Sequence, residues 1–345
     1  MTVHATMNSK ERCLSAIQGA PVDRVPVFPL LMHFAQQRLG ISYREFATHG
    51  RLLAEAQVHV LGKFAIDAIT ACSDAFRITA DLGGELAFPD DKPPYSLRPL
   101  VASASDLGKL GRPDPASSGS RMADRVLGVR EMVKAVGQNH LVLGWVDMPF
   151  AEACSLCGVS EFMILVYEDP VLAHQVLHFL ADIVIDFALA QIQAGAPMIG
   201  AGDAAASLIS PAFYREFALP YEQRVCAAIH NAGALMKLHI CGNTNALLDD
   251  MLTSGADLFN VDHLVPFEKA CAVYGTAGKC FKGNLDPVSD LLQASPEACL
   301  MHARERVARA RGLAYMLSPG CEVPGETPDS HMAALCSASP LSLLG

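Results

Sequence analysis

Short apolar runs alternate with amphipathic stretches along most of this chain. Eight runs have the length and apolar character of buried strands, and each ends near Gly, Pro, Asp, Asn or Ser. In chain order, they are Val25 to Met32, Ala65 to Cys72, His140 to Asp147, Pro197 to Asp203, Leu235 to Ile240, Leu258 to His263, Cys280 to Asp286 and Leu313 to Leu317. Helical patterns separate nearly all of them. This alternation predicts a parallel sheet covered by helices.

The stretches between these runs have helical periodicity or the composition of loops. The predicted helices are Asn8 to Gly19, Tyr43 to Gly62, Val126 to Val136, Ser160 to Tyr167, Pro170 to Ala194, Pro211 to Ala232, Thr244 to Ser254, Val265 to Tyr274, Pro296 to Arg311 and Asp329 to Cys336. Residues 76–120 are rich in Gly, Pro, Asp and Ser. We interpret them as a long excursion, with room for a hairpin, and not as a second core.

Eight strand–helix units in 345 residues predict an α/β fold, a single (β/α)8 TIM barrel covering residues 1–345. The barrel has an N-terminal helical extension and the long excursion near residues 76–120. A doubly wound open sheet is the alternative. It is disfavoured because no Gly-rich dinucleotide fingerprint follows a strand, and Gly200-Ala-Gly202 lies inside one.

Polar residues gather where the predicted strands end. They are Asp74, Asp147, Asp203, His239 with Cys241, Asp262 with His263, Asn284 with Asp286, and Cys321. The strand interiors are almost wholly apolar. In a barrel of this kind the active site lies at the carboxyl ends of the strands, so these side chains are the candidates for chemistry.

His239, Cys241 and Cys321 are the candidate metal ligands. Residues i and i+2 of a strand point to the same side, roughly 7 Å apart, so His239 and Cys241 enter one space. Cys321 follows another apolar strand, and a barrel can bring it opposite Cys241. Two sulfurs and one nitrogen make a zinc site with an open fourth position, as in catalytic zinc sites. The alternative is a half-buried His beside cysteines that only pack. A distance above about 6 Å between the two sulfurs would exclude a shared zinc ion.

Composition and charge narrow the class of protein. Net charge is −10 and no long run of Lys or Arg is present, which argues against nucleic acid as the main partner. Met1 to Lys10 lacks the apolar core of a signal peptide, and no run reaches the roughly 18 apolar residues of a membrane helix. We therefore expect a cytoplasmic protein, not bound to a membrane, whose 11 cysteines are reduced. Cys154 and Cys157 have C-x-x-C spacing, but packing is favoured because no second pair accompanies them.

The ligand set indicates a reaction class. Two thiolates give zinc less Lewis acidity toward water than three histidines would. Such a site suits binding an exogenous thiol as a nucleophilic thiolate, and therefore alkyl transfer and not hydrolysis.

Motifs along nearly the whole chain resemble the uroporphyrinogen decarboxylase superfamily. The matching stretches are Ser9-Lys-Glu-Arg12, Gly19-Ala-Pro-Val-Asp-Arg-Val-Pro26, Tyr167-Glu-Asp-Pro170, Ile209-Ser-Pro-Ala-Phe-Tyr214, Leu219-Pro-Tyr221, Gly283-Asn-Leu-Asp-Pro287 and Ser318-Pro-Gly-Cys-Glu-Val-Pro324. His-x-Cys with a distant Cys is similar to the zinc ligands of its corrinoid-linked branch, the methylcobamide:coenzyme M methyltransferase type. The superfamily fold is also a (β/α)8 barrel.

The resemblance implies a cofactor, partners and further site residues. Zinc would bind a thiol that takes a methyl group from a methylated corrinoid (methylcobalamin) held by a separate carrier protein. No Asp-x-His-x-x-Gly corrinoid motif is present in this chain. The acceptor is a thiol or a tetrahydrofolate-like molecule. Assembly into a homo-oligomer is compatible with the resemblance. Asp203 and Asp74 are candidate catalytic residues. Asn284 and Gly202 are candidate cofactor-binding residues, since small residues after Gly200 leave room for a corrinoid ring.

Two alternatives to methyl transfer remain open. One is a decarboxylase acting on a tetrapyrrole, which would need no metal. The stretch after Pro26, Val-Phe-Pro-Leu-Leu-Met-His33, lacks the arginines that hold carboxylates in the decarboxylases, so this reading is weaker. The other is a non-catalytic barrel that binds a corrinoid or a tetrapyrrole. Asp262, His263 and Glu322 are candidates to support a ligand or to fill the open position, although each is equally suited to a turn or to solvent. Trp145 is expected in the barrel core.

Overall fold

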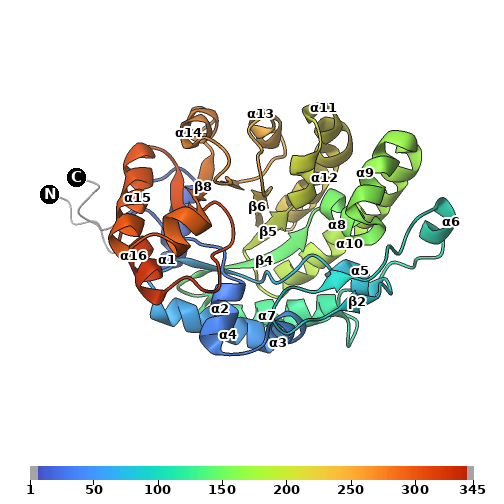
Figure 1. The fold of residues 1–345 in the computed structure, drawn as a ribbon, viewed down its shortest axis with the longest axis horizontal. Helices are drawn as coiled ribbons and strands as arrows, with labels where there is room; N and C mark the ends of the chain where they lie inside the picture. The colour runs from blue at the N-terminus through green and yellow to red at the C-terminus, as the bar shows by residue number, and fades with distance from the viewer. Residues whose placement is uncertain (1–6, 340–345) are drawn as a thin grey trace.

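A curled parallel sheet surrounded by helices forms the body of the molecule (Figure 1). The computed structural model describes residues 7–339. Its seven-stranded sheet has the order β1-β4-β5-β6-β7-β8-β9, and every neighbouring pair is parallel. The strands are β1 (Ala68–Thr70), β4 (Leu141–Asp147), β5 (Met198–Gly202), β6 (Leu235–His239), β7 (Leu258–Asn260), β8 (Cys280–Leu285) and β9 (Tyr315–Pro319). The architecture is that of a (β/α)8 barrel, as the sequence predicts.

The first predicted strand lies at the seam between β9 and β1. It makes isolated parallel bridges from Val27 to Leu317 and from Leu30 to Glu322. On its other side the carbonyl of Val27 accepts a hydrogen bond of 2.8 Å from the amide of Asp67, next to β1. Pro26 and Pro29 have no amide hydrogen to donate, so this segment cannot form a regular ladder.

Most predicted helices are present, with shifted ends. They are α1 (Ser9–Ile17), α7 (Arg121–Val136), α9 (Val159–Glu168), α10 (Pro170–Gln193), α12 (Leu219–Asn231), α13 (Leu248–Leu252), α14 (Phe267–Thr276), α15 (Pro296–Arg309) and α16 (Asp329–Cys336). Asn8 caps α1: its side chain accepts a hydrogen bond from the amide of Glu11, and the Glu11 carboxylate accepts one from the amide of Asn8.

Some helices depart from the prediction. The stretch 43–62 is two helices, α3 (Tyr43–Thr48) and α4 (Gly50–Lys63), broken at the extended residue His49. The stretch 211–232 begins with α11 (Pro211–Phe213) and a π-helical turn, η2 (Tyr214–Ala218), before α12. Helices α2 (His33–Leu39) and α8 (Pro149–Cys157) are not among the predicted helices. The excursion holds α5 (Arg77–Asp81), the antiparallel hairpin of β2 (Leu86–Ala87) and β3 (Tyr95–Ser96), and α6 (Ala104–Leu107).

Alternation along the strands separates two apolar clusters. Met236 and Leu238 on β6 face the surrounding helices and join the large cluster between sheet and helices. Leu141, Leu143 and Met198 face the barrel interior, with residues of α1 closing the bottom. Trp145 lies in the interior with Leu30 and Cys72, as predicted for a core residue.

Helix α10 is the one helix, within residues 7–339, with the length and apolar composition that a membrane span requires. It packs on α8, α12 and β4 as an outer helix of the barrel, and 56% of its most apolar window is buried. This burial accounts for its apolar composition.

Candidate metal centre

Strand β6 aims His239 and Cys241 into the barrel mouth. Leu238 and Ile240, which alternate with them, are fully buried against the helices. His239 is buried and Cys241 is partly accessible. The Cys241 sulfur lies 2.9 Å from Nε2 of His239. The period of two along a strand thus sets two of the three candidate ligands side by side.

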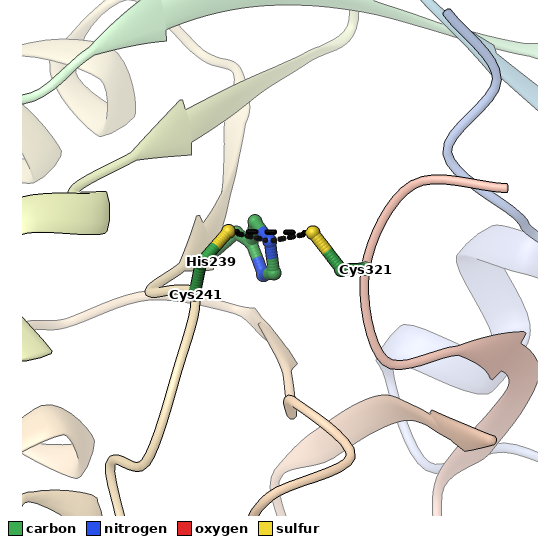
Figure 2. A group of neighbouring side chains, drawn as sticks. All are labelled: His239, Cys241 and Cys321. Carbon is green, nitrogen blue, oxygen red and sulfur yellow. Dashed lines mark hydrogen bonds between the residues drawn. The ribbon is translucent and has the colours of Figure 1, made fainter. Parts of the chain in front are cut away.

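Cys321 reaches the same space from the turn after β9. Its sulfur lies 3.4 Å from the sulfur of Cys241 and 3.7 Å from Nε2 of His239. Figure 2 shows the two cysteines pointing toward one another from opposite segments, with the imidazole between them. The expectation that these three side chains meet is confirmed, because the sulfur–sulfur distance is well below 6 Å.

The spacing suits one tetrahedral ion. Two sulfurs bound to the same zinc at about 2.3 Å each lie about 3.8 Å apart at the ideal angle. The ligand atoms of His239, Cys241 and Cys321 all lie within 4.8 Å of one another, and this is the one such cluster of His, Cys, Asp and Glu in the described part of the chain. Two thiols and an imidazole are the donors that zinc prefers. The residues therefore fit a metal ion, while metal binding itself stays a prediction.

Asn260, at the end of β7, supports both arms of the cluster. Its backbone oxygen lies 3.4 Å from Nδ1 of His239, and its side-chain nitrogen donates a hydrogen bond of 2.9 Å to the carbonyl of Gly320. When Nδ1 carries the proton and donates it to this carbonyl, the lone pair of Nε2 points toward the sulfurs. A histidine that binds a metal through Nε2 needs this tautomer.

Asp262 supports the loop that follows Cys241. One carboxylate oxygen accepts a hydrogen bond of 2.9 Å from the amide of Gly242, and the other accepts 2.9 Å from the amide of Leu264. Nδ1 of His263 lies 3.1 Å from this carboxylate, and Nε2 of the same ring lies 3.9 Å from the carboxylate of Asp286. Asp262 therefore holds the backbone beside a ligand and does not point a free carboxylate at the cluster.

The two thiols share one proton unequally. Hydrogen bonds from Cys241 and then His239 outweigh burial and lower the pKa of Cys321 to about 3. The hydrogen bond to Cys321, together with burial, raises the pKa of Cys241 well above its ordinary value. These shifts favour a thiolate at Cys321 and a protonated thiol at Cys241, and a positive charge close to both sulfurs would favour loss of the second proton.

Glu322, considered for the open position, is bound elsewhere. Its Oε1 accepts hydrogen bonds from the amide of His33, at 2.7 Å, and from Nδ1 of the same residue, at 3.0 Å. Burial lowers the pKa of His33, but the contact with Glu322 outweighs it and the net pKa is raised. Glu322 therefore anchors the start of α2 to the turn that carries Cys321.

Asp203, predicted as catalytic, has its carboxylate inside the protein and not at the cluster. One oxygen accepts 2.8 Å from the amide of Ala151 in the first turn of α8. Burial and the neighbouring carboxyl of Glu222 raise the pKa of Asp203 well above its ordinary value. Its backbone amide bonds the carbonyl of His239 at 2.9 Å. Asp203 therefore satisfies an amide in the first turn of α8, the helix that follows the neighbouring strand β4, and its backbone joins β5 to β6.

Asp74, the other predicted catalytic residue, is paired with arginines. Arg121 binds both of its oxygens at 2.8 and 2.9 Å, and Arg77 lies 3.6 Å away. Burial raises the pKa of Asp74, but Arg121 and then Arg77 outweigh it, so the net pKa falls far below its ordinary value. A carboxylate held in this way neither gives nor takes a proton near neutral pH, so we assign it a structural role.

Asn284 and Gly202, predicted to bind a cofactor, also have internal partners. The amide nitrogen of Asn284 donates to the backbone oxygens of Asp262 and Val265, at 3.2 and 2.7 Å. A Cβ on Gly202 would lie 2.8 Å from the Trp145 ring. The indole of Trp145 therefore fills the space that the small residues leave. We do not assign a corrinoid-binding site to it.

Three interior residues were missed by sequence reasoning. Lys237 and Lys282 are fully buried in strands whose interiors were expected to be almost wholly apolar, and Asn260 lies between them on β7. The sequence does contain a signal for Lys237. It precedes His239 by two residues, so its side chain lies on the face that carries the ligands and must enter the barrel.

Cys154 and Cys157, which have C-x-x-C spacing, are buried on α8. Burial raises the pKa of the Cys157 thiol to about 12, in agreement with a packing role.

Comparison with known proteins assigns the fold and the motifs to one family. A family model described as uroporphyrinogen decarboxylase (URO-D) matches residues 8–339. The chain belongs to the uroporphyrinogen decarboxylase family. A uroporphyrinogen decarboxylase of Nocardia farcinica is 33% identical over 316 residues, covering 88% of this chain and 86% of the relative. One from Myxococcus xanthus is 29% identical over 296 residues, covering 81% of each.

Two solved structures share the fold of this family member. A methyltransferase from Methanosarcina mazei has a TM-score of 0.87 at 24% identity, covering 96% of this chain and 98% of that one. A B12-independent methionine synthase from Shewanella sp. W3-18-1 has a TM-score of 0.57 at 13% identity, covering 91% and 95%. At these identities the likeness establishes the fold.

Proposed function

We propose that this family member is a zinc-dependent methyltransferase that moves a methyl group from a methylated corrinoid, held by a carrier protein, to a thiol or a tetrahydrofolate-like acceptor. The observation that carries the proposal is the meeting of two sulfurs and one imidazole nitrogen at the barrel mouth. The acid and amide side chains expected beside them are engaged in structural bonds, so the triad is the candidate chemical centre.

The triad leaves room for one more donor. When bound, zinc would supply a positive charge that lowers the pKa of a coordinated thiol, so that the sulfur stays nucleophilic at neutral pH. His239 would present Nε2, oriented by Asn260, and the two cysteines would present thiolates. The loops anchored by Asp262 and Glu322 fix the backbone beside Cys241 and Cys321, which limits how far the ligands can move.

The proposed reaction balances as a nucleophilic substitution. The acceptor sulfur loses its proton to solvent and forms a bond to the methyl carbon. The carbon–cobalt bond of the methylated corrinoid breaks, and its electron pair stays on cobalt, which passes from cobalt(III) to cobalt(I). The corrinoid is a substrate delivered by the partner.

The names of two similar structures support this choice among the activities of the family. One is called a methyltransferase and the other a B12-independent methionine synthase, whose product carries a methyl group on sulfur. Both share the barrel with this chain, so alkyl transfer to sulfur is compatible with the fold. The two sulfurs and one nitrogen of the triad are the reason that we propose alkyl transfer to sulfur for this chain.

Decarboxylation of a tetrapyrrole is the second candidate, and the names of the curated relatives favour it. Decarboxylation would need no metal, and it would give the cluster of His239, Cys241 and Cys321 no chemical role. The segment that carries decarboxylase arginines in the family has none here. The buried Arg77 is bound by Asp147, and the partly buried Arg121 is bound by Asp74.

Metal analysis and turnover separate these candidates. We expect about one zinc per purified chain, retained in Cys271→Ser on α14 and lost in Cys321→Ser. Methylcobalamin with added thiol should be demethylated by the wild-type protein and by Cys271→Ser, and not by Cys321→Ser. Conversion of uroporphyrinogen that persists in Cys321→Ser, with no bound zinc, would establish the decarboxylase instead.

A further inference from the structure

Two lysines are enclosed inside the barrel, below the metal-ligand triad. Lys237 on β6 and Lys282 on β8 each have 0% exposure. The Nζ atom of Lys282 donates a hydrogen bond of 2.5 Å to the carbonyl of Phe28. The Nζ atom of Lys237 has no hydrogen-bond partner in the described part of the chain. A buried ammonium without a partner is costly, so its presence needs a reason.

Alternation along the strands places both lysines under the triad. Lys237 precedes His239 by two residues and Cys241 by four, so all three side chains enter the same side, at steps of roughly 7 Å. Lys282 on β8 lies beside Lys237, because the amino groups of both face the ring of Phe28. Both amino groups therefore lie next to the interior layer that precedes the candidate ligands.

Aromatic rings hold these ammonium groups. The ring centroid of Phe28 lies 4.0 Å from Nζ of Lys282 and 5.6 Å from Nζ of Lys237, and that of Trp145 lies 4.7 Å from Lys237. Gly200 makes this possible, because a Cβ there would lie 2.6 Å from the Trp145 ring. Cation–π contacts stabilise a positive charge without neutralising it.

The negative groups that face these lysines are thiols. The charge of Lys237 is attracted by the thiols of Cys72, Cys241 and Cys321. Burial and Lys237 lower the pKa of Lys282 well below its ordinary value, against the attraction of Cys321 and Cys13. Neither lysine forms a salt bridge with a carboxylate within residues 7–339. Lys237 is thus the positive group of this layer that faces the sulfurs of the triad.

We propose that Lys237, supported by Lys282, makes the open position of the triad select an anionic fourth ligand, a thiolate, over a neutral donor. The inference rests on the proposed function and narrows its acceptor to a thiol. A divalent ion with two thiolates has no net charge, so a third thiolate adds one negative charge that the ammonium beneath it stabilises. A neutral nitrogen donor brings no charge and gains nothing. Lys237 is a positioning residue, because it acts through the charge of the site.

Cobalt substitution gives a test that does not depend on turnover. Co²⁺ is bound in place of zinc, and its visible absorption bands are followed while 2-mercaptoethanol, which binds as a thiolate, or imidazole, which binds as a neutral donor, is added. In Lys237→Met we expect the Kd of the thiol to rise roughly tenfold, as for the loss of a unit charge in a low-dielectric site, with the Kd of imidazole unchanged within about twofold. Lys279→Met, before β8, should resemble the wild type.

Selectivity separates this role from a merely structural one. Equal weakening of both ligands in Lys237→Met, or no weakening of either, overturns the inference. If Lys237→Met does not fold, Lys282→Met must weaken thiol binding selectively by a smaller factor, and the inference fails if it does not. A wild-type chain that binds no Co²⁺ refutes the proposed function and this inference together, and that result is visible without any variant.

Discussion

Asn260 shows how a single amide can set the geometry of a site to which it contributes no ligand. Its backbone oxygen faces His239, and its side chain holds the carbonyl of Gly320 just before Cys321. The two ligand-bearing segments come from opposite sides of the mouth, and Asn260 touches both. Mutation of residues that orient metal ligands in this way commonly lowers metal affinity by about 10- to 100-fold.

Removal of this amide should weaken metal binding. We expect Asn260→Ala to lower zinc affinity by about 10- to 100-fold, because the turn before Cys321 loses its hydrogen bond. Competition with a chromophoric chelator measures the change. Asn139→Ala, in the turn between α7 and β4, is the matched control. An affinity equal to wild type in both variants would show that Asn260 does not orient the ligands.

At this scale the sequence predicts ligands better than it predicts supporting residues. His239 and Cys241 follow from the period of two in one strand, and Cys321 follows once eight strands are expected to close into a barrel. Asp74 and Asp203 look equally exposed in the sequence, since both end strands. Their partners, Arg121 and the amide of Ala151, come from other segments and only the fold brings them close.

Helices α4 and α7 meet through two glycines. A Cβ on Gly128 would lie 2.9 Å from the carbonyl of Gly50, and a Cβ on Gly50 would lie 2.0 Å from the carbonyl of Asp124. The break at His49 starts a new helix at Gly50, whose amide donates 2.7 Å to the carboxylate of Asp124. The periodicity of 43–62 is continuous in the sequence, so only the partner helix reveals this break.

Close packing of these helices leads to a stability prediction. Gly128→Ala should lower the free energy of unfolding by about 1–3 kcal/mol, because backbone atoms must move to admit the methyl group. Gly62→Ala, on the same pair of helices but with nothing within 4 Å of its Cβ, should be neutral or stabilising by up to about 1 kcal/mol. Denaturant unfolding compares them, and equal effects would contradict the packing account.

Strand β5, α8 and α12 are joined by a pair of buried carboxyl groups, Asp203 and Glu222. Burial raises the pKa of Glu222 to about 7, although hydrogen bonds with Tyr214 and Asp203 oppose it. The folded protein therefore holds a proton that the unfolded chain releases near pH 4.5. Because the native state binds more protons in this window, the contribution of Glu222 to stability falls as pH rises from about 4.5 to about 7.

Glu222→Gln should remove that dependence. We expect the difference in unfolding free energy between wild type and variant to shift in favour of the variant as pH rises through this window, by about 1.4 kcal/mol for each unit of pKa elevation. Chemical denaturation at several pH values measures it, with the exposed Glu55→Gln as control. A constant difference from pH 4.5 to 7.5 would exclude the raised pKa.

Over the whole molecule, the triad connects β6 with the turn after β9. A metal ion that binds the folded chain and not the unfolded one adds stability by mass action, about 2.7 kcal/mol at a free concentration of 100 times Kd. Zinc should therefore raise the Tm of the metal-free protein, and a chelator should reverse the rise. Cys321→Ser should show no such response in thermal unfolding, and a rise of equal size there would place the metal elsewhere.

The barrel as a whole follows from the sequence because apolar runs and helical periods alternate eight times. The exception is the first strand, where Pro26 and Pro29 reduce the pairing to isolated bridges at Val27 and Leu30. The sequence marks this irregularity correctly, since proline cannot donate to a ladder. It gives no sign that Glu322, the partner of Leu30, also binds His33 and so ties the seam to the turn of Cys321.

The order of the ligands along the chain has a consequence for assembly during translation. His239 and Cys241 leave the ribosome together, while Cys321 follows 80 residues after Cys241, behind β7, β8 and β9. A nascent chain that stops before β9 offers a metal two donors, and a complete one offers three. If the proposed function is correct, all three donors come together only after the last strand has been synthesised and has paired with the first segment.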